Sequence, residues 1–118
     1  MDNRHRPIPV LDGKNYPLWK QSVRTYIKSI DARAWKAVIV GYDRPMINDD
    51  DGDRIPKPEE NYTDEEMAVQ NFNDKALNAI ITNIDYNLFR LIQNCKAGKD
   101  AWEILERQFE GDKSVKKS

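Results

Sequence analysis

The sequence has very few of the side chains from which disulfides and metal sites are built. It contains one cysteine, Cys95, and one histidine, His5, among 118 residues. A single cysteine cannot form an internal disulfide, which excludes a small secreted domain held together by such bonds. The same two residues are too few for a Cys/His zinc site. We therefore expect no metal, no cofactor, and a reducing, intracellular environment.

The sequence also lacks long apolar stretches and an excess of positive charge. No apolar run approaches the ~18–20 residues of a membrane-spanning helix, and the N-terminus has no hydrophobic signal segment. The 19 lysines and arginines are offset by 20 acids, which gives a formal net charge of −1. A domain that binds nucleic acid through bulk charge normally has a clear basic excess. We therefore expect neither a membrane nor nucleic acid bound through bulk charge as a partner.

The chain is long enough for one domain, but its charge is distributed unevenly. Residues 1–40 carry a net charge of +5, residues 41–70 carry −7 and residues 71–118 carry +1. The negative segment contains the run Asp49-Asp50-Asp51-Gly52-Asp53 and shows no sustained periodicity. We therefore expect a long, exposed acidic loop without regular structure at residues 41–62.

The rest of the chain shows the spacing of three and four apolar residues that is typical of helices. Asn15-Tyr16-Pro17 predicts the start of a helix that runs to Ile30, and a shorter helix follows from Asp31 to Gly41. Thr63-Asp64-Glu65-Glu66 is a capping box and begins the longest predicted helix. Asp85 is the expected N-cap of a fourth helix, and residues 98–111 form the fifth. The predicted fold is an all-α compact bundle of about five helices, with the acidic loop between the second and third.

This pattern divides the chain into an N-terminal tail (1–14), a helical domain (15–111) and a C-terminal tail (112–118). The three tryptophans fall on the apolar faces of different helices, so we expect them to meet in one small core. Tyr26 and Val69 lie on the same faces. The predicted core consists of Trp19, Val23, Ile27, Trp35, Phe72, Ile80, Trp102, Leu105 and Phe109.

No set of residues has the composition of an active site. His5 lies in a tail, where the geometry that a general base needs is not fixed. Cys95 is expected to be a half-buried small residue at a helix end; the alternative is a thiol whose pKa is lowered somewhat by the adjacent Lys96, but no histidine is placed to act as its base. The acidic run fails as a calcium-binding EF-hand loop, because Ile47 occupies the first position and Pro58 the twelfth. We therefore expect that the protein is not an enzyme.

A basic face is the main candidate for a binding surface. Lys20, Arg24 and Lys28 are spaced by four residues along the first predicted helix. The face is either an ordinary solvated surface, a contact with a neighbouring subunit, or a contact with RNA phosphates. Trp19 and Tyr26 belong to the apolar face, so no exposed aromatic residue is expected beside these bases for stacking on RNA.

Five short motifs follow one another along the chain. Leu11-Asp12-Gly13-Lys14-Asn15-Tyr16 followed by Trp19 has the pattern L-x-G-x-N-Y-x-x-W, and a block from Trp35 to Tyr42 comes next. The later motifs are residues 76–80, residues 92–95, and residues 97–111, which end in A-W-x-x-L-x-x-x-F-x-G. In this order they resemble the Gag polyproteins of Copia-type LTR retrotransposons, especially those of plants.

The resemblance implies a capsid domain with the fold of the N-terminal capsid lobe of retroviruses. Such a domain self-assembles with copies of itself into virus-like particles around the element's RNA. The chain ends at Ser118, before a second lobe and a zinc knuckle, so RNA would be bound indirectly, through parts of Gag absent here. The basic face of Lys20, Arg24 and Lys28 is the expected subunit contact. The alternatives are a domesticated adaptor that binds a host protein, and an RNA-binding module that uses the basic face.

Overall fold

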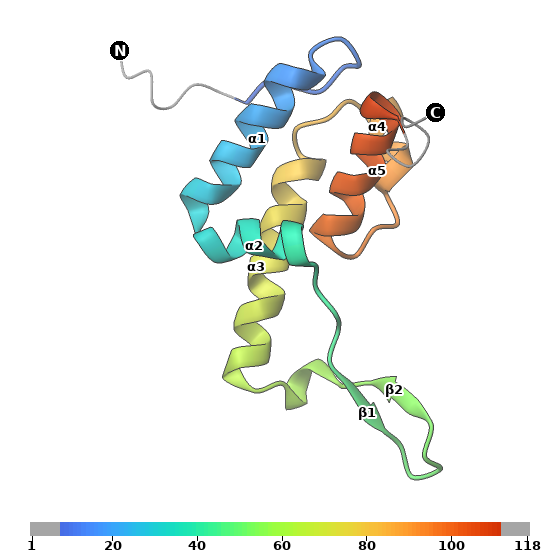
Figure 1. Cartoon of the computed structure of the whole chain (residues 1–118). Coiled ribbons are helices and arrows are strands. Elements are labelled where there is room, and N and C mark those ends of the chain that lie inside the picture. The colour runs from blue at the N-terminus through green and yellow to red at the C-terminus, as the bar shows by residue number, and fades with distance from the viewer. Residues whose placement is uncertain (1–7, 112–118) are drawn as a thin grey trace.

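In the computed structural model, which describes residues 8–111, five α-helices pack together and a β-hairpin projects from them (Figure 1). The chain is thus mostly helical, as predicted, with a small two-stranded sheet that the sequence analysis did not predict. The elements in order are α1 (Tyr16–Ile30), α2 (Ala32–Val40), β1 (Met46–Asn48), β2 (Arg54–Pro56), the 3₁₀ turn η2 (Glu59–Asn61), α3 (Asp64–Ile81), α4 (Tyr86–Ile92) and α5 (Gly98–Glu110).

Local signals set the boundaries of α1 and α2. Pro17 lies in the first turn of α1, where its missing N–H leaves no hydrogen bond unmade. Asp31 adopts an extended conformation that ends α1, and its carboxylate accepts a hydrogen bond from the Arg33 N–H at 2.8 Å, which caps α2. Gly41 then ends α2 at φ +101°, a conformation that favours glycine.

The longest helix, α3, begins at the predicted capping box. The Glu66 N–H donates to Thr63 Oγ1 at 3.1 Å, and the Thr63 N–H donates to Glu66 Oε1 at 2.9 Å. Asp85 caps α4 in a similar way by accepting from the Leu88 N–H at 2.9 Å. Both starts follow from side chains within four residues of the helix, so the sequence alone is sufficient to find them.

The three tryptophans meet in one hydrophobic core. The Trp19 and Trp102 rings stack with centroids 5.9 Å apart, and Trp35 meets Trp102 edge-on at 5.4 Å. The predicted core residues that are buried are Trp19, Val23, Ile27, Ile80, Trp102 and Leu105, and those that are half-buried against them are Trp35, Phe72 and Phe109.

The segment before α1 contributes to this core. Leu11, which the sequence analysis assigns to the N-terminal tail, is completely buried and forms a parallel bridge with Ile84. Its N–H donates to the Asn83 carbonyl at 2.9 Å, and the Trp19 indole N–H donates to the same carbonyl at 2.6 Å. The folded region therefore includes residues around Leu11, whereas the predicted C-terminal tail, 112–118, lies outside the described residues.

The prediction that residues 41–62 lack regular structure is wrong. β1 and β2 form an antiparallel hairpin in which Ile47 is paired with Ile55 and Asn48 with Arg54. A compact turn makes this pairing possible, because the Asp49 carboxylate accepts from the N–H groups of both Asp51 and Asp53.

Two side chains on the predicted apolar faces are also more exposed than expected. Tyr26 is 45% exposed on α1 and Val69 is 41% exposed on α3. Both stand at helical spacing from core residues, but no element covers them in the part of the chain that the structure describes.

Candidate interaction surfaces

The three bases of the predicted basic face on α1 have different surroundings in the structure. Lys20 turns toward α5, where its Nζ lies 3.0 Å from Glu106 Oε2 and 2.6 Å from Glu110 Oε2. The Tyr16 hydroxyl also donates a hydrogen bond to Glu110. Lys20 thus joins α1 to α5 within the chain, and its role is structural.

The contact between α1 and α5 alters the pKa values of its two hydrogen-bond donors, Tyr16 and Lys20. Burial and the hydrogen bond to Glu110 raise the pKa of Tyr16 well above its usual range. Burial alone would lower the pKa of Lys20, but the hydrogen bonds to Glu110 and Glu106 raise it above its usual value. Lys20 is therefore held as a charged ammonium at physiological pH.

Arg24 and Lys28 remain on the surface. Arg24 is exposed and has no ion pair among residues 8–111. Lys28 is also exposed, and its Nζ lies 5.7 Å from the centroid of the Trp35 ring on α2. Arg33 and Lys36 are both exposed on α2, so the outward-facing bases are distributed over two helices. We call Arg24, Lys28, Arg33 and Lys36 the basic surface.

The opposite charge is concentrated at the tip of the hairpin. Asp50, Asp51 and Asp53 are exposed in the turn between β1 and β2, and the structure gives none of them a cation partner among the described residues. Figure 1 shows the hairpin extending away from the helices, on the far side of the molecule from α1. The acidic turn is therefore presented to solvent on a projecting element.

The base of the hairpin is closed by a hydrogen bond and linked to α3 by an ion pair. The Lys57 N–H donates to the Pro45 carbonyl at 2.9 Å, which closes the hairpin. Lys57 Nζ lies 2.7 Å from Glu66 Oε1 in the capping box of α3. Burial, followed by the proximity of Tyr62, raises the pKa of Tyr42 to about 12. These contacts fix the two ends of the hairpin relative to the helices.

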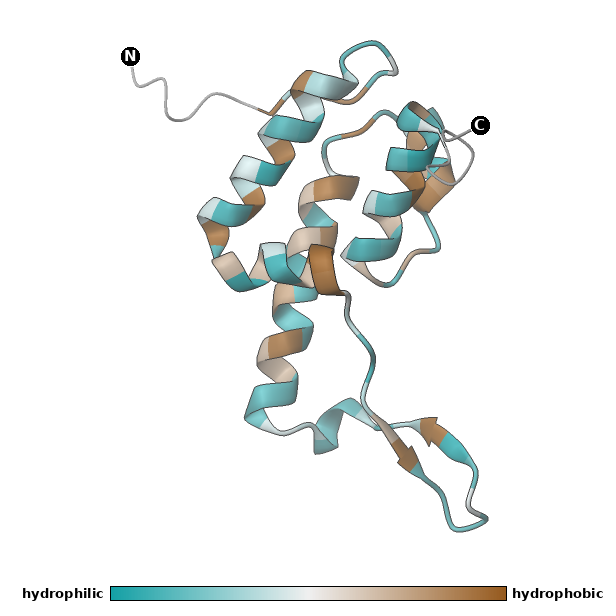
Figure 2. Ribbon diagram, viewed as in Figure 1, coloured by the Kyte–Doolittle hydropathy of each residue, from teal (hydrophilic) through white to brown (hydrophobic). Residues whose placement is uncertain are grey.

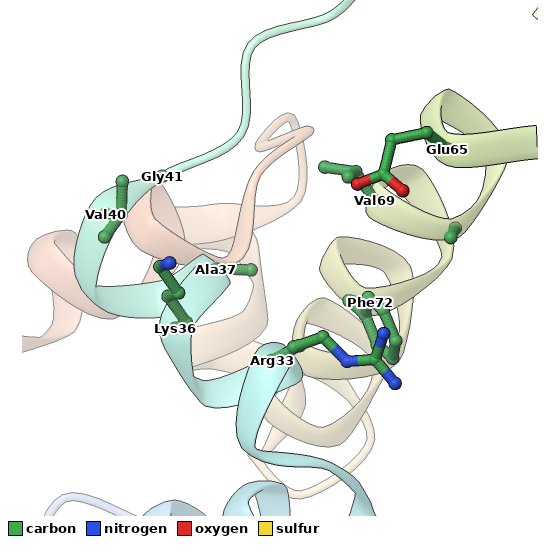
Figure 3. Close-up of a pocket in the computed structure, with 9 residues that line it drawn as sticks. Arg33, Lys36, Ala37, Val40, Gly41, Glu65, Val69 and Phe72 are labelled. Atoms are coloured by element: carbon green, nitrogen blue, oxygen red, sulfur yellow. The ribbon is translucent and has the colours of Figure 1, made fainter. Parts of the chain in front are cut away.

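A groove of about 260 Å³ lies between α2 and α3. Its floor is apolar, from Ala37 and Val40 on α2 and from Val69 and Phe72 on α3 (Figure 3). Val40 is 65% exposed, and in Figure 2 the ribbon at the C-terminal end of α2 has the brown colour of hydrophobic residues. The rim of the groove is charged and consists of Arg33, Lys36 and Glu65.

Arg33 is positioned at this rim by two neighbours. Its guanidinium carbon lies 4.4 Å from the centroid of the Phe72 ring, and its Nη2 lies 3.1 Å from Asp31 Oδ2. Hydrogen bonds from Arg33 lower the pKa of Asp31. Lys36, one turn further along α2, has no ion-pair partner within residues 8–111 and is the open cation of the groove.

Of the two residues considered for catalysis, only Cys95 lies in the part of the chain that the structure describes. Cys95 is half-buried after α4, as expected, and burial followed by the charge of Asp100 raises its pKa, which is opposite to the alternative of a pKa lowered by Lys96. His5 lies outside the described residues. Among residues 8–111 there is no group of three or more histidine, cysteine, aspartate or glutamate side chains arranged to hold a metal ion.

Comparisons with protein-family models, with curated proteins and with solved structures find no match for this chain. Within the described residues, none of the helices combines the length and the apolar character needed to cross a membrane.

Two features of the surface were missed by the reasoning from sequence. The ordered hairpin has a local signal, since Asp-Gly within a short polar segment flanked by Met46-Ile47 and Ile55 is typical of a hairpin turn. The α2–α3 groove has no such signal, because it depends on how far apart two helices pack.

Proposed function

We propose that this chain is a structural self-assembly domain of a Gag-type capsid. It contributes lateral subunit contacts to a shell that encloses the element's RNA in the cytoplasm, and the RNA itself is bound by other parts of Gag. The five motifs support this proposal, and their residues include the core side chains Trp19, Trp102 and Leu105.

The observation that carries the proposal is the separation of opposite charges on one molecule. The basic surface lies on α1 and α2, and the acidic turn stands at the end of a projecting hairpin. Two different patches that complement each other make a head-to-tail contact, and such contacts repeat into rings or open arrays. Each contact can be weak, because an assembly multiplies it.

The contact is expected to be electrostatic in character and therefore sensitive to salt. Lys20 is not part of it, since both of its acid partners belong to the same chain. Arg24 and Lys28 remain as the residues of α1 that face a neighbour. The proposed subunit contact on α1 therefore includes Arg24 and Lys28 but not Lys20.

Light scattering coupled to size-exclusion chromatography tests the proposal. The mass of the wild-type protein should rise with concentration, and this rise should be smaller at high salt. The variant Arg24→Glu/Lys28→Glu should stay a monomer. Arg90→Glu/Lys96→Glu makes the same change in net charge on exposed residues in and after α4, and it should behave as the wild type.

A wild-type protein that stays a monomer at high concentration in low salt would overturn self-assembly by this domain. Equal assembly of both double variants would show that total charge, not this surface, is responsible. Binding of RNA that is lost in Arg24→Glu/Lys28→Glu but not in the control would favour the RNA-binding alternative instead.

A further inference from the structure

The α2–α3 groove has the properties of a site for a small apolar segment with acidic residues beside it. Its floor exposes Val40 and Val69 to solvent, although each is large enough to gain from burial. Its α2 rim presents Arg33 and Lys36, and its α3 rim presents Glu65. An occupant that matches these features needs two apolar side chains, adjacent acids and one base.

The hairpin carries this combination. Met46 and Ile47 on β1 are each 37% exposed, and as neighbours on a strand they point to opposite faces of the hairpin. The exposed acids Asp50 and Asp51 follow in the turn, and the exposed base Arg54 begins β2. The apolar pair matches the apolar floor of the groove. The acids match the bases of the α2 rim, and Arg54 matches Glu65 on the α3 rim.

The hairpin and the groove of one molecule are held apart. Figure 1 shows the hairpin leading away from α2 and α3, and the hydrogen bond between Lys57 and Pro45 closes its base. The hydrophobic core of the described residues includes none of residues 46–56. The hairpin is therefore available to a groove on another molecule.

We propose that the α2–α3 groove receives the hairpin of a second copy of this chain. The hairpin of one molecule enters between α2 and α3 of the other, so that Met46 and Ile47, on its opposite faces, pack on Val40 of α2 and Val69 of α3, and the acidic turn lies against Lys36. This inference rests on the proposed self-assembly and assigns it a specific seat. Apolar contact supplies affinity, and the charges fix which way the hairpin enters.

Polar substitutions in the floor of the groove test the apolar part of this contact. Val40→Ser/Val69→Ser should weaken self-association at least about tenfold, because burial of a valine contributes more than the ~1.4 kcal/mol that corresponds to tenfold in affinity. Met46→Ser/Ile47→Ser should weaken it similarly. Leu91→Ser, on an exposed apolar residue of α4, should leave it unchanged. Circular dichroism checks that every variant is folded.

Charge exchange tests the direction of entry. Lys36→Glu and Asp51→Lys should each self-associate less than the wild type, since like charges then meet in the groove. A mixture of the two should associate again, because each hairpin then meets a rim of opposite charge. Adding Val69→Ser to the Lys36→Glu partner should weaken this mixed association, which separates docking in the groove from general charge attraction.

A photo-crosslinking amino acid at position 69 identifies the occupant directly. In a mixture of isotopically light and heavy protein, crosslinks between copies should map to residues 46–56. Crosslinks to another segment, or only within one copy, would overturn the inference. If the wild type self-associates and the groove variants associate equally well, the groove assignment fails while the proposed function stands. A monomeric wild type contradicts both.

Discussion

Lys20 and Arg24 are one helical turn apart on α1, and their spacing in the sequence assigns both to the same basic face. Lys20 reaches Glu106 and Glu110 on α5 at 3.0 Å and 2.6 Å, whereas Arg24 points to solvent without an ion pair in residues 8–111. The acids that pair with Lys20 follow it by more than eighty positions, so spacing on α1 cannot reveal them. The same limit applies to Asn73, whose buried amide donates to the Lys96 carbonyl and accepts from the Gly98 N–H.

Replacement of Lys20 by methionine should therefore destabilise the fold. Two carboxylates would remain at a seam where the side chains are only about a quarter exposed, with 23% for Glu106 and 25% for Glu110. We expect a loss of about 1–2 kcal/mol in the free energy of unfolding, between the values for exposed and fully buried ion pairs. Urea denaturation followed by circular dichroism measures it.

Arg24→Met is the matched control for that experiment. It removes one positive charge from the same helix, and its effect on the free energy of unfolding should stay within about 0.5 kcal/mol. Because folding is unaffected, any loss of self-association in Arg24→Met is a property of the surface. Equal destabilisation by both substitutions would show that the contacts of Lys20 with α5 contribute nothing.

The five helices illustrate what is predictable at the scale of elements. Each has a start or stop signal within a few residues, such as the capping box of Thr63 and Glu66 or the left-handed Gly111 after α5. The hairpin was missed because its strands have three residues each and its acidic composition is typical of disorder. Turn geometry at Asp49 outweighs composition here. The helices are long enough for their periodicity to be read from the sequence, whereas these strands are too short to show one.

The capping box of α3 also gives the structure a dependence on pH. The hydrogen bond from Lys57, followed by that from the Thr63 N–H, lowers the pKa of Glu66. A carboxylate whose pKa is lower in the folded state stabilises that state above its unfolded pKa of 4.5, and this contribution is lost as the pH falls through the folded pKa. Acidification should therefore loosen the link between hairpin and α3.

The variant Glu66→Gln isolates this charge, because glutamine still accepts the hydrogen bond of the capping box. Wild type should be the more stable of the two at neutral pH, and the difference should disappear as the pH is lowered below about 4.5. Thermal denaturation across pH 3–7 measures the difference. Glu60→Gln, on an exposed residue of η2, should show no such trend. A difference that stays constant down to pH 3 would contradict the role of the Glu66 charge.

At the scale of the whole molecule, the oppositely charged segments of the sequence fall on different elements of the fold. The positive first third forms α1 and α2, and the negative middle third contains the hairpin and the start of α3. The sequence predicts this imbalance, but only the fold shows that the acids project while part of the basic surface borders an apolar groove. The molecule measures 53 × 46 × 26 Å along its principal axes, so it is flattened and not spherical.

This arrangement predicts that the hairpin serves assembly and not folding. Residues 46–56 can be replaced by an Asn-Gly turn, because Pro45 and Lys57 are already joined by a 2.9 Å hydrogen bond. The shortened protein should retain the helical circular dichroism of the wild type, since the hairpin adds nothing to the described core. It should remain a monomer at concentrations where the wild type associates, as measured by light scattering.

The shortened protein distinguishes a role of the hairpin in folding from a role in association, which single substitutions do not do. If it unfolds, the hairpin anchors α3, and its acids are incidental. If it folds and still associates, the contact between copies lies elsewhere, and both the acidic turn and the apolar pair on β1 are excluded as its source. If it folds, remains a monomer, and also blocks association when mixed in excess with wild type, its intact groove is capturing wild-type hairpins. That result requires a head-to-tail contact, because a shortened copy with a groove and no hairpin then ends each growing array.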